Sequence, residues 1–228
     1  MTTAETLQAM YERLLACFGR RGWWPAETPF EVMVGAVLTQ NTNWKNVEKA
    51  IANLKREGVL APRPLLEMPF DRLTELIRPA GYFRVKARRL TNLLRWLDRE
   101  FDSDLDAMFA VPLDDLRERL LSVNGVGPET CDSILLYAGN LPTFVVDAYT
   151  CRVVVRHELL LPDEVTYDEV KTLFEEHLER DTALFNEYHA LLVNVGKDFC
   201  RPKPRCRAGC PLEPLLSATA EVRDEAVE

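Results

Sequence analysis

Long apolar runs are missing from this sequence of 228 residues, and so is the basic, apolar and small-residue succession of a signal peptide. These absences argue against a membrane-spanning or secreted protein, so we expect a cytoplasmic protein with no membrane partner. Alternating apolar and polar runs are also scarce, which argues against a β-sheet. Neither a repeat nor a low-complexity segment is present, and the length suits one large domain or two lobes.

Apolar residues recur at spacings of three and four almost throughout the chain, for example over 90–97. This is the period of amphipathic helices, so the predicted fold class is all-α. Proline and glycine clusters divide the pattern into about ten helices. The short apolar run 144–146 is expected to be an extended linker. The helix N-caps that we predict are Thr28, Asp114 and Thr166.

The net charge of −8 is unexpected for a protein that binds nucleic acid, but the distribution of charge matters more than its sum. Basic residues form two clusters, and part of the acidic excess lies in the tail. The first basic cluster is Arg78, Arg84, Lys86, Arg88 and Arg89, the second is Lys197, Arg201, Lys203, Arg205 and Arg207, and the acidic tail contains Glu221, Asp224, Glu225 and Glu228. Such clusters are usually solvated surface, and they give modest support to a phosphate-binding face.

The most informative segment is the turn Gly125–Val126–Gly127 between two helical runs. Glycine has no Cβ, so it can adopt positive φ and lets another part of the chain come close. Pro128 then fits the first turn of the next helix. The turn presents backbone N–H groups at a helix start, which suits a phosphate of a DNA strand. An ordinary joint between two helices has the same pattern.

Four motifs between residues 27 and 210 resemble those of the endonuclease III branch of the helix-hairpin-helix DNA glycosylases. They are GAVLTQNT at 35–42, GVGPET at 125–130, the pair Val146–Asp147 and the cysteine-containing run that begins at Cys200. Within that branch, the segments 23–25 and 38–44 are most similar to 3-methyladenine DNA glycosylase III. The resemblance implies a monomeric base-excision enzyme that acts on damaged bases in double-stranded DNA and needs no nucleotide cofactor.

The resemblance also implies two helical lobes with a DNA-binding cleft between them. One lobe is a six-helix barrel over residues 29–141, which contains the helix-hairpin-helix. The other combines residues 1–28 with 142–228 and contains the cysteine loop. The residues that would contact DNA are Gly125, Val126 and Gly127 of the hairpin and Lys197, Arg201, Lys203 and Arg205 of the second basic cluster.

Two acidic residues are candidates for the chemistry. The catalytic aspartate of the family falls on Asp147, where a carboxylate would stabilise the positive charge that develops on the sugar. A helix cap is the alternative role of this aspartate. Glu129 stands where bifunctional members have a lysine that forms a Schiff base, so the chain is expected to lack lyase activity and to use water. Glu129 can equally be a first-turn acid that favours the helix dipole.

Aromatic residues bear on the choice of substrate. Trp23, Trp24 and Trp44 are expected to stack on a flipped base, and a cationic base such as N3-alkylated adenine would gain most from their ring faces. Packing in the core is the alternative for these tryptophans. Gln40 occupies, in the family, the gap left by the flipped nucleotide, although on spacing alone it is simply the end of a helix.

Cys200, Cys206 and Cys210 lie close together in a proline- and arginine-rich run, which suggests a metal or iron–sulfur site. Many relatives bind a [4Fe–4S] cluster here through four cysteines. In this chain the fourth place falls at Leu216, so the expected cluster is incompletely ligated by cysteine. A carboxylate, water or distant residue would complete it, or the loop has lost its cluster. A mononuclear zinc site is disfavoured, since only His189 is near in sequence.

The leading hypothesis is thus a monofunctional DNA glycosylase for alkylated purines. A related enzyme that removes uracil, thymine or oxidised bases is an alternative. A non-catalytic protein that binds or bends damaged DNA is a second alternative, which Glu129 and the missing cysteine favour and Asp147 disfavours. A helical scaffold with no nucleic acid role is the third, and the hairpin argues against it.

Overall fold

The computed structural model describes residues 1–206 and 209–216, and no strand occurs within these ranges. Arg207 and the acidic residues of the tail lie outside the described part. The all-α prediction is confirmed. The helix count differs from the expected ten because several of the twelve α-helices in the described ranges are only five to seven residues long. No helix of the described residues is both long and apolar enough to cross a membrane.

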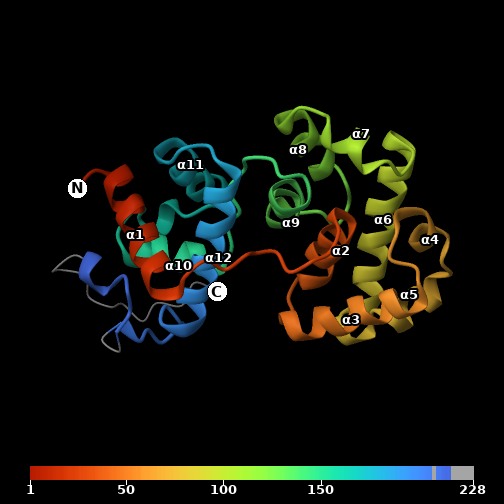
Figure 1. The fold of residues 1–228 in the computed structure, drawn as a ribbon, viewed down its shortest axis with the longest axis horizontal. Coiled ribbons are helices and arrows are strands. Elements are labelled where there is room, and N and C mark those ends of the chain that lie inside the picture. The colour runs from red at the N-terminus through yellow and green to blue at the C-terminus, as the bar shows by residue number, and fades with distance from the viewer. Residues whose placement is uncertain (207–208, 217–228) are drawn as a thin grey trace. The chain divides into compact units, whose positions relative to one another are not determined.

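The chain divides into two compact units, of which one consists of residues 1–23 and the chain from residue 142 onward. Its core includes four aromatic rings, among which Phe144 and Phe174 stack with their centroids 4.0 Å apart. The hydroxyl of Tyr188 donates to the carbonyl of Leu7 at 2.8 Å, which ties the last long helix to the first. The elements of this unit are α1 (Thr3–Phe18), α10 (Ala148–Arg156), η3 (Pro162–Glu164), α11 (Tyr167–His177), α12 (Thr182–Asp198) and η5 (Glu213–Leu215) (Figure 1).

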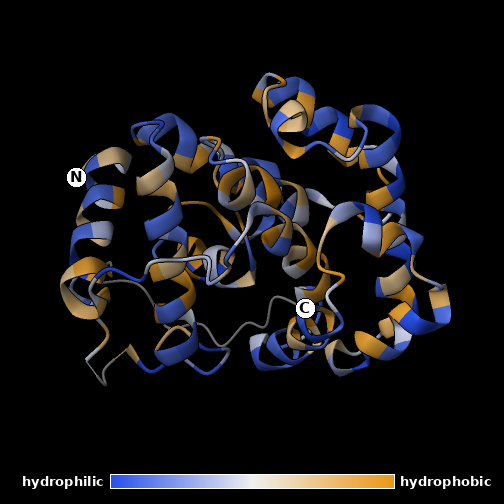
Figure 2. Cartoon of the chain, turned by 45° about the vertical axis from the view of Figure 1, so that its right-hand side comes forward, coloured by the Kyte–Doolittle hydropathy of each residue, from blue (hydrophilic) through white to orange (hydrophobic). Residues whose placement is uncertain are grey.

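The other unit comprises residues 24–141. Its longest helix, α6 (Phe83–Phe101), is amphipathic and buries one face among the leucines of its neighbours, and the alternation of apolar and polar residues along the helices is visible in Figure 2. The remaining elements are α2 (Pro29–Thr39), α3 (Trp44–Glu57), α4 (Pro62–Glu67), α5 (Phe70–Leu76), η1 (Arg78–Ala80), α7 (Leu105–Phe109), α8 (Leu113–Leu121), α9 (Pro128–Ser133) and the π-helical segment η2 (Ile134–Ala138).

The helix caps test the local predictions. The side chain of Thr28 accepts from the N–H of Glu31 at the start of α2, and Thr166 caps α11, so both predictions are confirmed. The prediction for Asp114 is wrong. Helix α8 begins earlier, with Pro112 as its N-cap, and Asp114 therefore lies in the first turn, where its charge favours the helix dipole.

The run 144–146 is buried and non-helical, as expected of an extended linker. Two of its backbone N–H groups meet side chains of α11. The N–H of Phe144 donates to Glu175 Oε1 at 2.7 Å. The N–H of Val146 lies 3.4 Å from the hydroxyl of Tyr167. These two contacts with side chains of α11 fix the backbone immediately before Asp147 and thereby help to position Asp147.

Candidate active site and nucleic-acid interface

Asp147 is the N-cap of α10, which is the alternative role that the sequence indicates for it. Its Oδ1 accepts from the N–H of Thr150 at 2.8 Å and from the Thr150 hydroxyl at 3.0 Å. The other oxygen, Oδ2, lies 3.6 Å from Nε2 of His189 on α12. Capping therefore occupies one carboxylate oxygen and leaves the second turned toward an imidazole.

The Asp147 side chain is only 12% exposed, and that of His189 only 8%. Burial disfavours the charged carboxylate, but the neighbouring His189 and the hydrogen bonds from Thr150 outweigh it. Together they hold the pKa of Asp147 below its ordinary value. The site thus keeps a nearly buried carboxylate in its ionised form.

Helices α10 and α12 come close because Gly196 has no side chain. A Cβ at Gly196 would lie 2.4 Å from Cδ1 of Tyr149, so the tyrosine ring needs the space that the glycine leaves open. The glycine thereby allows the packing of α12 against α10 that brings His189 to Asp147. Sequence reasoning missed both Gly196 and His189, because the partners are separated by more than forty residues.

The hairpin joins α8 to α9 through the turn that the sequence singled out. Gly125 has a φ of +101°, and a Cβ there would lie 2.3 Å from Cγ of Arg89. Glycine is therefore required at this position for two independent reasons. Gly127 is different, because its backbone is extended and a Cβ would meet nothing within 4 Å. Val126 between them is buried, and Glu129 lies exposed in the first turn of α9.

Gln40 follows α2 directly and is hydrogen-bonded to the hairpin. Its side-chain amide donates to the carbonyl of Gly125 at 3.1 Å and to the hydroxyl of Thr130 at 2.9 Å. Its own oxygen accepts from Nη1 of Arg89 at 2.5 Å. The structure thus brings together two predicted DNA-contacting features, and it adds Arg89 as their common neighbour.

Two of the three predicted tryptophans, Trp24 and Trp44, form one aromatic group with Tyr137, which the sequence did not indicate. The ring of Trp24 meets Trp44 edge-on at 5.1 Å and lies 5.2 Å from Tyr137. Trp23 precedes them in sequence and belongs to the other compact unit. The indole N–H of Trp44 donates to Oε1 of Glu48 at 3.0 Å, which fixes the direction of that ring.

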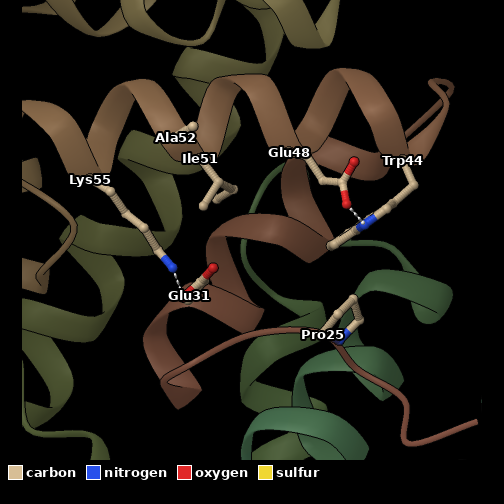
Figure 3. A pocket seen from close by; sticks show the side chains of 7 residues that line it. All are labelled: Pro25, Glu31, Trp44, Glu48, Ile51, Ala52 and Lys55. Atoms are coloured by element: carbon tan, nitrogen blue, oxygen red, sulfur yellow. Dashed lines mark hydrogen bonds and ion pairs between the residues drawn. The ribbon is translucent and has the colours of Figure 1, made fainter.

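A cavity of about 170 Å³ opens beside Trp44 (Figure 3). Its apolar wall consists of Pro25, Trp44, Ile51 and Ala52, and its polar groups are Glu31, Glu48 and Lys55. Lys55 pairs with the buried Glu31 at 2.9 Å. The exposed Glu48 points its carboxylate at the indole, so an aromatic surface and carboxylates share one cavity.

The basic clusters are only partly surface. In the first cluster Arg78, Arg84 and Arg88 are exposed and flank Tyr82, which is 72% exposed and has a φ of +42°. Lys86 is a correction to the predicted cluster. It is buried, and its Nζ donates to the carbonyls of Leu38 and Ala80. Burial, together with Arg89, lowers the pKa of Lys86 to about 8.

In the second cluster the four described basic side chains are all exposed, as a phosphate-binding role requires. They are Lys197, Arg201, Lys203 and Arg205. The loop that carries three of them is attached to α10 by two arginines. Arg152 donates to the carbonyl of Cys200 at 3.0 Å, and Arg156 donates to the carbonyls of residues 201 and 202.

The cysteine loop is the segment in which the sequence predicts a metal or iron–sulfur site. Cys200 and Cys210 are buried and Cys206 is half-buried, yet no three His, Cys, Asp or Glu side chains in the described ranges are grouped to bind a metal ion. Nη1 of Arg156 lies 3.1 Å from the Cys200 sulfur. Burial raises the pKa of Cys206, and that of Cys210 to about 11. Within the described ranges no fourth ligand is grouped with the three thiols, so these residues do not fit a four-ligand cluster.

Comparison with known proteins agrees with this geometry. A family model described as HhH-GPD superfamily base excision DNA repair protein matches residues 34–180. The chain is 47% identical over 211 residues to "Putative DNA repair glycosylase MJ1434" of Methanocaldococcus jannaschii, covering 92% of this chain and 94% of that protein.

Two solved structures extend the comparison. The first is H. pylori 3-methyladenine DNA glycosylase (MagIII) bound to 1,N6-ethenoadenine, which is 29% identical with a TM-score of 0.74. That match covers 86% of this chain and 98% of the other. The second is a non-covalent complex of endonuclease III with DNA, which is 23% identical with a TM-score of 0.79, over 95% of this chain and 96% of the other. The second likeness concerns the fold alone.

Proposed function

Because the chain belongs to the HhH-GPD superfamily of base excision DNA repair proteins and is an endonuclease III-like DNA glycosylase, we propose that it removes alkylated purine bases without cleaving the strand. The observation that carries the proposal is the ionised, nearly buried carboxylate of Asp147. A glycosylase breaks the bond between C1′ of the sugar and a ring nitrogen of the base. The transition state places positive charge on the sugar, which a carboxylate stabilises.

In the proposed reaction the target nucleotide first leaves the base stack. The C1′–N bond then breaks, and its electron pair leaves with the base. Asp147 stabilises the resulting oxocarbenium character through Oδ2, since Oδ1 is already held by Thr150. Water adds to C1′ and loses a proton, which completes the hydrolysis. A cationic alkylated purine leaves as a neutral molecule, so this reaction needs little acid assistance.

The choice of alkylated purines is supported by the aromatic group of Trp24, Trp44 and Tyr137. Ring faces attract a cationic base more strongly than a neutral one. The cavity beside Trp44 adds carboxylates to this aromatic surface. The similarity to a 3-methyladenine glycosylase at 29% identity points the same way.

The absence of strand cleavage is supported by Glu129, which stands in the first turn of α9. A carboxylate cannot form the Schiff base that an amine forms with the sugar. The chemistry therefore ends at the abasic site, with water as nucleophile.

DNA binding is assigned to the hairpin turn 125–127 and to the exposed basic residues of the two clusters. Phosphate contacts of this type fix the position of the protein on the duplex and carry no sequence information. An iron–sulfur cluster has no part in the proposed reaction. The iron and sulfide content of the purified protein determines whether the three thiols bind one.

The test is release of free base from defined duplexes that each contain a single lesion. We expect release from duplexes with 3-methyladenine, 7-methylguanine or 1,N6-ethenoadenine, and none from those with uracil, thymine glycol or undamaged bases. Release of oxidised pyrimidines alone would instead support an endonuclease III-like specificity. Tight binding to lesions with no release of any base would support a non-catalytic lesion-binding protein.

A further inference from the structure

We propose that His189 is a positioning residue for the glycosylase reaction, which keeps the outer oxygen of Asp147 ionised and available to the sugar. The inference rests on the proposed function for its catalytic meaning. Its physical basis is the contact between α10 and α12, which both belong to the compact unit that includes residues 1–23.

The two oxygens of Asp147 have different surroundings. Oδ1 accepts two hydrogen bonds from Thr150, which fix the plane and direction of the carboxylate. Oδ2 lies 3.6 Å from the imidazole of His189, which is within ion-pair distance but longer than a direct hydrogen bond. The imidazole is thus placed to influence the charge of Oδ2, while Oδ1 is held by Thr150.

The other charged or titratable groups on the adjoining parts of α10 and α12 are directed elsewhere. Glu187 accepts from the backbone N–H of Arg21 at 2.6 Å, and the hydroxyl of Tyr188 donates to the carbonyl of Leu7. Arg152 lies over the ring of Tyr149 and donates to the cysteine loop. Among the described residues, His189 is the titratable side chain that acts on the Asp147 carboxylate.

This arrangement addresses a requirement of the reaction. A carboxylate that stabilises a cationic transition state must be ionised, yet burial favours its protonated form. The hydrogen bonds from Thr150 and the neighbouring His189 together compensate for burial of the carboxylate. His189 is the partner on the side of Oδ2, where charge is needed during catalysis.

The experiment compares His189→Ala and His189→Gln with the wild-type protein. Glutamine keeps an N–H donor, whereas alanine removes the partner. Single-turnover base release is measured against pH on a duplex with 3-methyladenine, whose positive charge is permanent and does not change over the pH range of the measurement. His177→Gln is the matched control, since His177 is on α11 of the same unit and its Nδ1 lies 2.9 Å from the carbonyl oxygen of Leu173.

We expect the acidic limb of the pH profile to move to higher pH by about one unit in His189→Ala, with release reduced by up to about tenfold on the acidic limb and nearly unchanged at neutral pH. The sign follows from the chemistry, because loss of the partner raises the pKa of the buried Asp147 and the reaction requires its ionised form. His189→Gln, which keeps only an N–H donor, should move the limb in the same direction by no more than His189→Ala does. An unshifted limb in His189→Ala would overturn the proposal.

A second measurement separates this proposal from the proposed function. The carboxyl carbon of Asp147 is titrated by NMR in the DNA-free protein, with and without His189→Ala. A raised carboxyl pKa in the variant supports the role of His189, and an unchanged one refutes it. If the wild type releases no base from any lesion duplex, the proposed function fails, while this titration still decides whether His189 controls Asp147.

Discussion

The side-chain amide of Gln40 donates to the backbone carbonyl of Gly125 at 3.1 Å, across 85 positions of sequence. This bond joins the end of α2 to the hairpin turn, and the Arg89 guanidinium closes the contact from the other side of the glutamine. The end of α2 and the hairpin are therefore held in one fixed register. For Gln40 to enter a DNA duplex as the family resemblance implies, it must exchange these hydrogen bonds for contacts with DNA.

Gly125→Ala should destabilise the protein and weaken its binding to DNA. The substitution places a side chain at a φ of +101° and within 2.3 Å of the Arg89 side chain. We expect a loss of about 2–3 kcal/mol in the free energy of unfolding. Gly127→Ala is the matched control and should change stability by less than about 1 kcal/mol, since that backbone is extended and the space is open. Urea unfolding of both variants measures the difference, and equal losses would contradict the assignment.

Asp147→Asn should reduce base release by about 100-fold or more, because it removes the charge that stabilises the transition state. DNA affinity should stay within a few-fold of the wild type, since asparagine can still cap α10. Asp181→Asn provides the control, because Asp181 caps α12 in the same way without belonging to the site. Single-turnover kinetics and DNA titration give the two readouts. Near-normal release by Asp147→Asn would remove this carboxylate from the mechanism.

Borohydride should not trap the wild-type protein on DNA that contains an abasic site. The expected lysine is replaced by Glu129, so no amine is available at that position to form a Schiff base. The measurement is a covalent band on a denaturing gel, with a bifunctional glycosylase as positive control. Trapping of the wild type would show that another amine of the chain reaches the sugar.

Arg156→Ala should loosen the cysteine loop, whereas an iron chelator should not. The guanidinium of Arg156 contacts the Cys200 sulfur and two carbonyls of the loop, so its loss leaves these acceptors without their donor. We expect a drop of about 1–3 kcal/mol in unfolding free energy and a weaker, less salt-dependent affinity for DNA. Thermal unfolding before and after chelation of anaerobically purified protein provides the comparison. Loss of visible colour together with a lower Tm would show that an iron–sulfur cluster maintains the loop.

Lys86 should make stability depend on alkaline pH. Its folded-state pKa of about 8 lies below the ordinary value of 10.5, so the unfolded chain binds the proton more tightly. Between pH 8 and about 10 the unfolded state therefore holds more protons, and stability should rise with pH. Below pH 8 the full cost of charging Lys86 is present. Urea unfolding of the wild type and Lys86→Met across this range tests the sign, and parallel curves would contradict it.

Sequence reasoning found the features that depend on local pattern. Patterns of a few residues predict the helical period and the glycine turn. They also predict the caps Thr28 and Thr166 and the position of Asp147 before a helix. Motif resemblance added the family. Each of these depends on short-range geometry that a residue and its near neighbours determine.

The partners of those residues were not predictable in the same way. The sequence places Lys86 in a cluster of basic surface residues, but its side chain is buried and donates to two backbone carbonyls. His189 reads as a core histidine on α12, and only the packing of α12 on α10 brings it to Asp147. Tyr137 likewise meets Trp24 through tertiary contact. Such pairings depend on how the helices pack against one another, and a local sequence pattern does not predict this packing.

The π-helical segment η2 makes the aromatic group sensitive to chain length as well as to residue type. The N–H of Gly139 donates to the carbonyl of Ile134 at 3.0 Å, five positions back, so this turn contains one residue more than an α-helical turn of four. Removing a single residue before Tyr137 in this segment would let the turn close as an α-helix and would change the direction of the Tyr137 side chain around the axis. Tyr137 would then lose its present packing on Trp24 with no change in its identity. The deletion of one codon therefore changes the aromatic surface formed by Trp24, Trp44 and Tyr137 without any substitution in it.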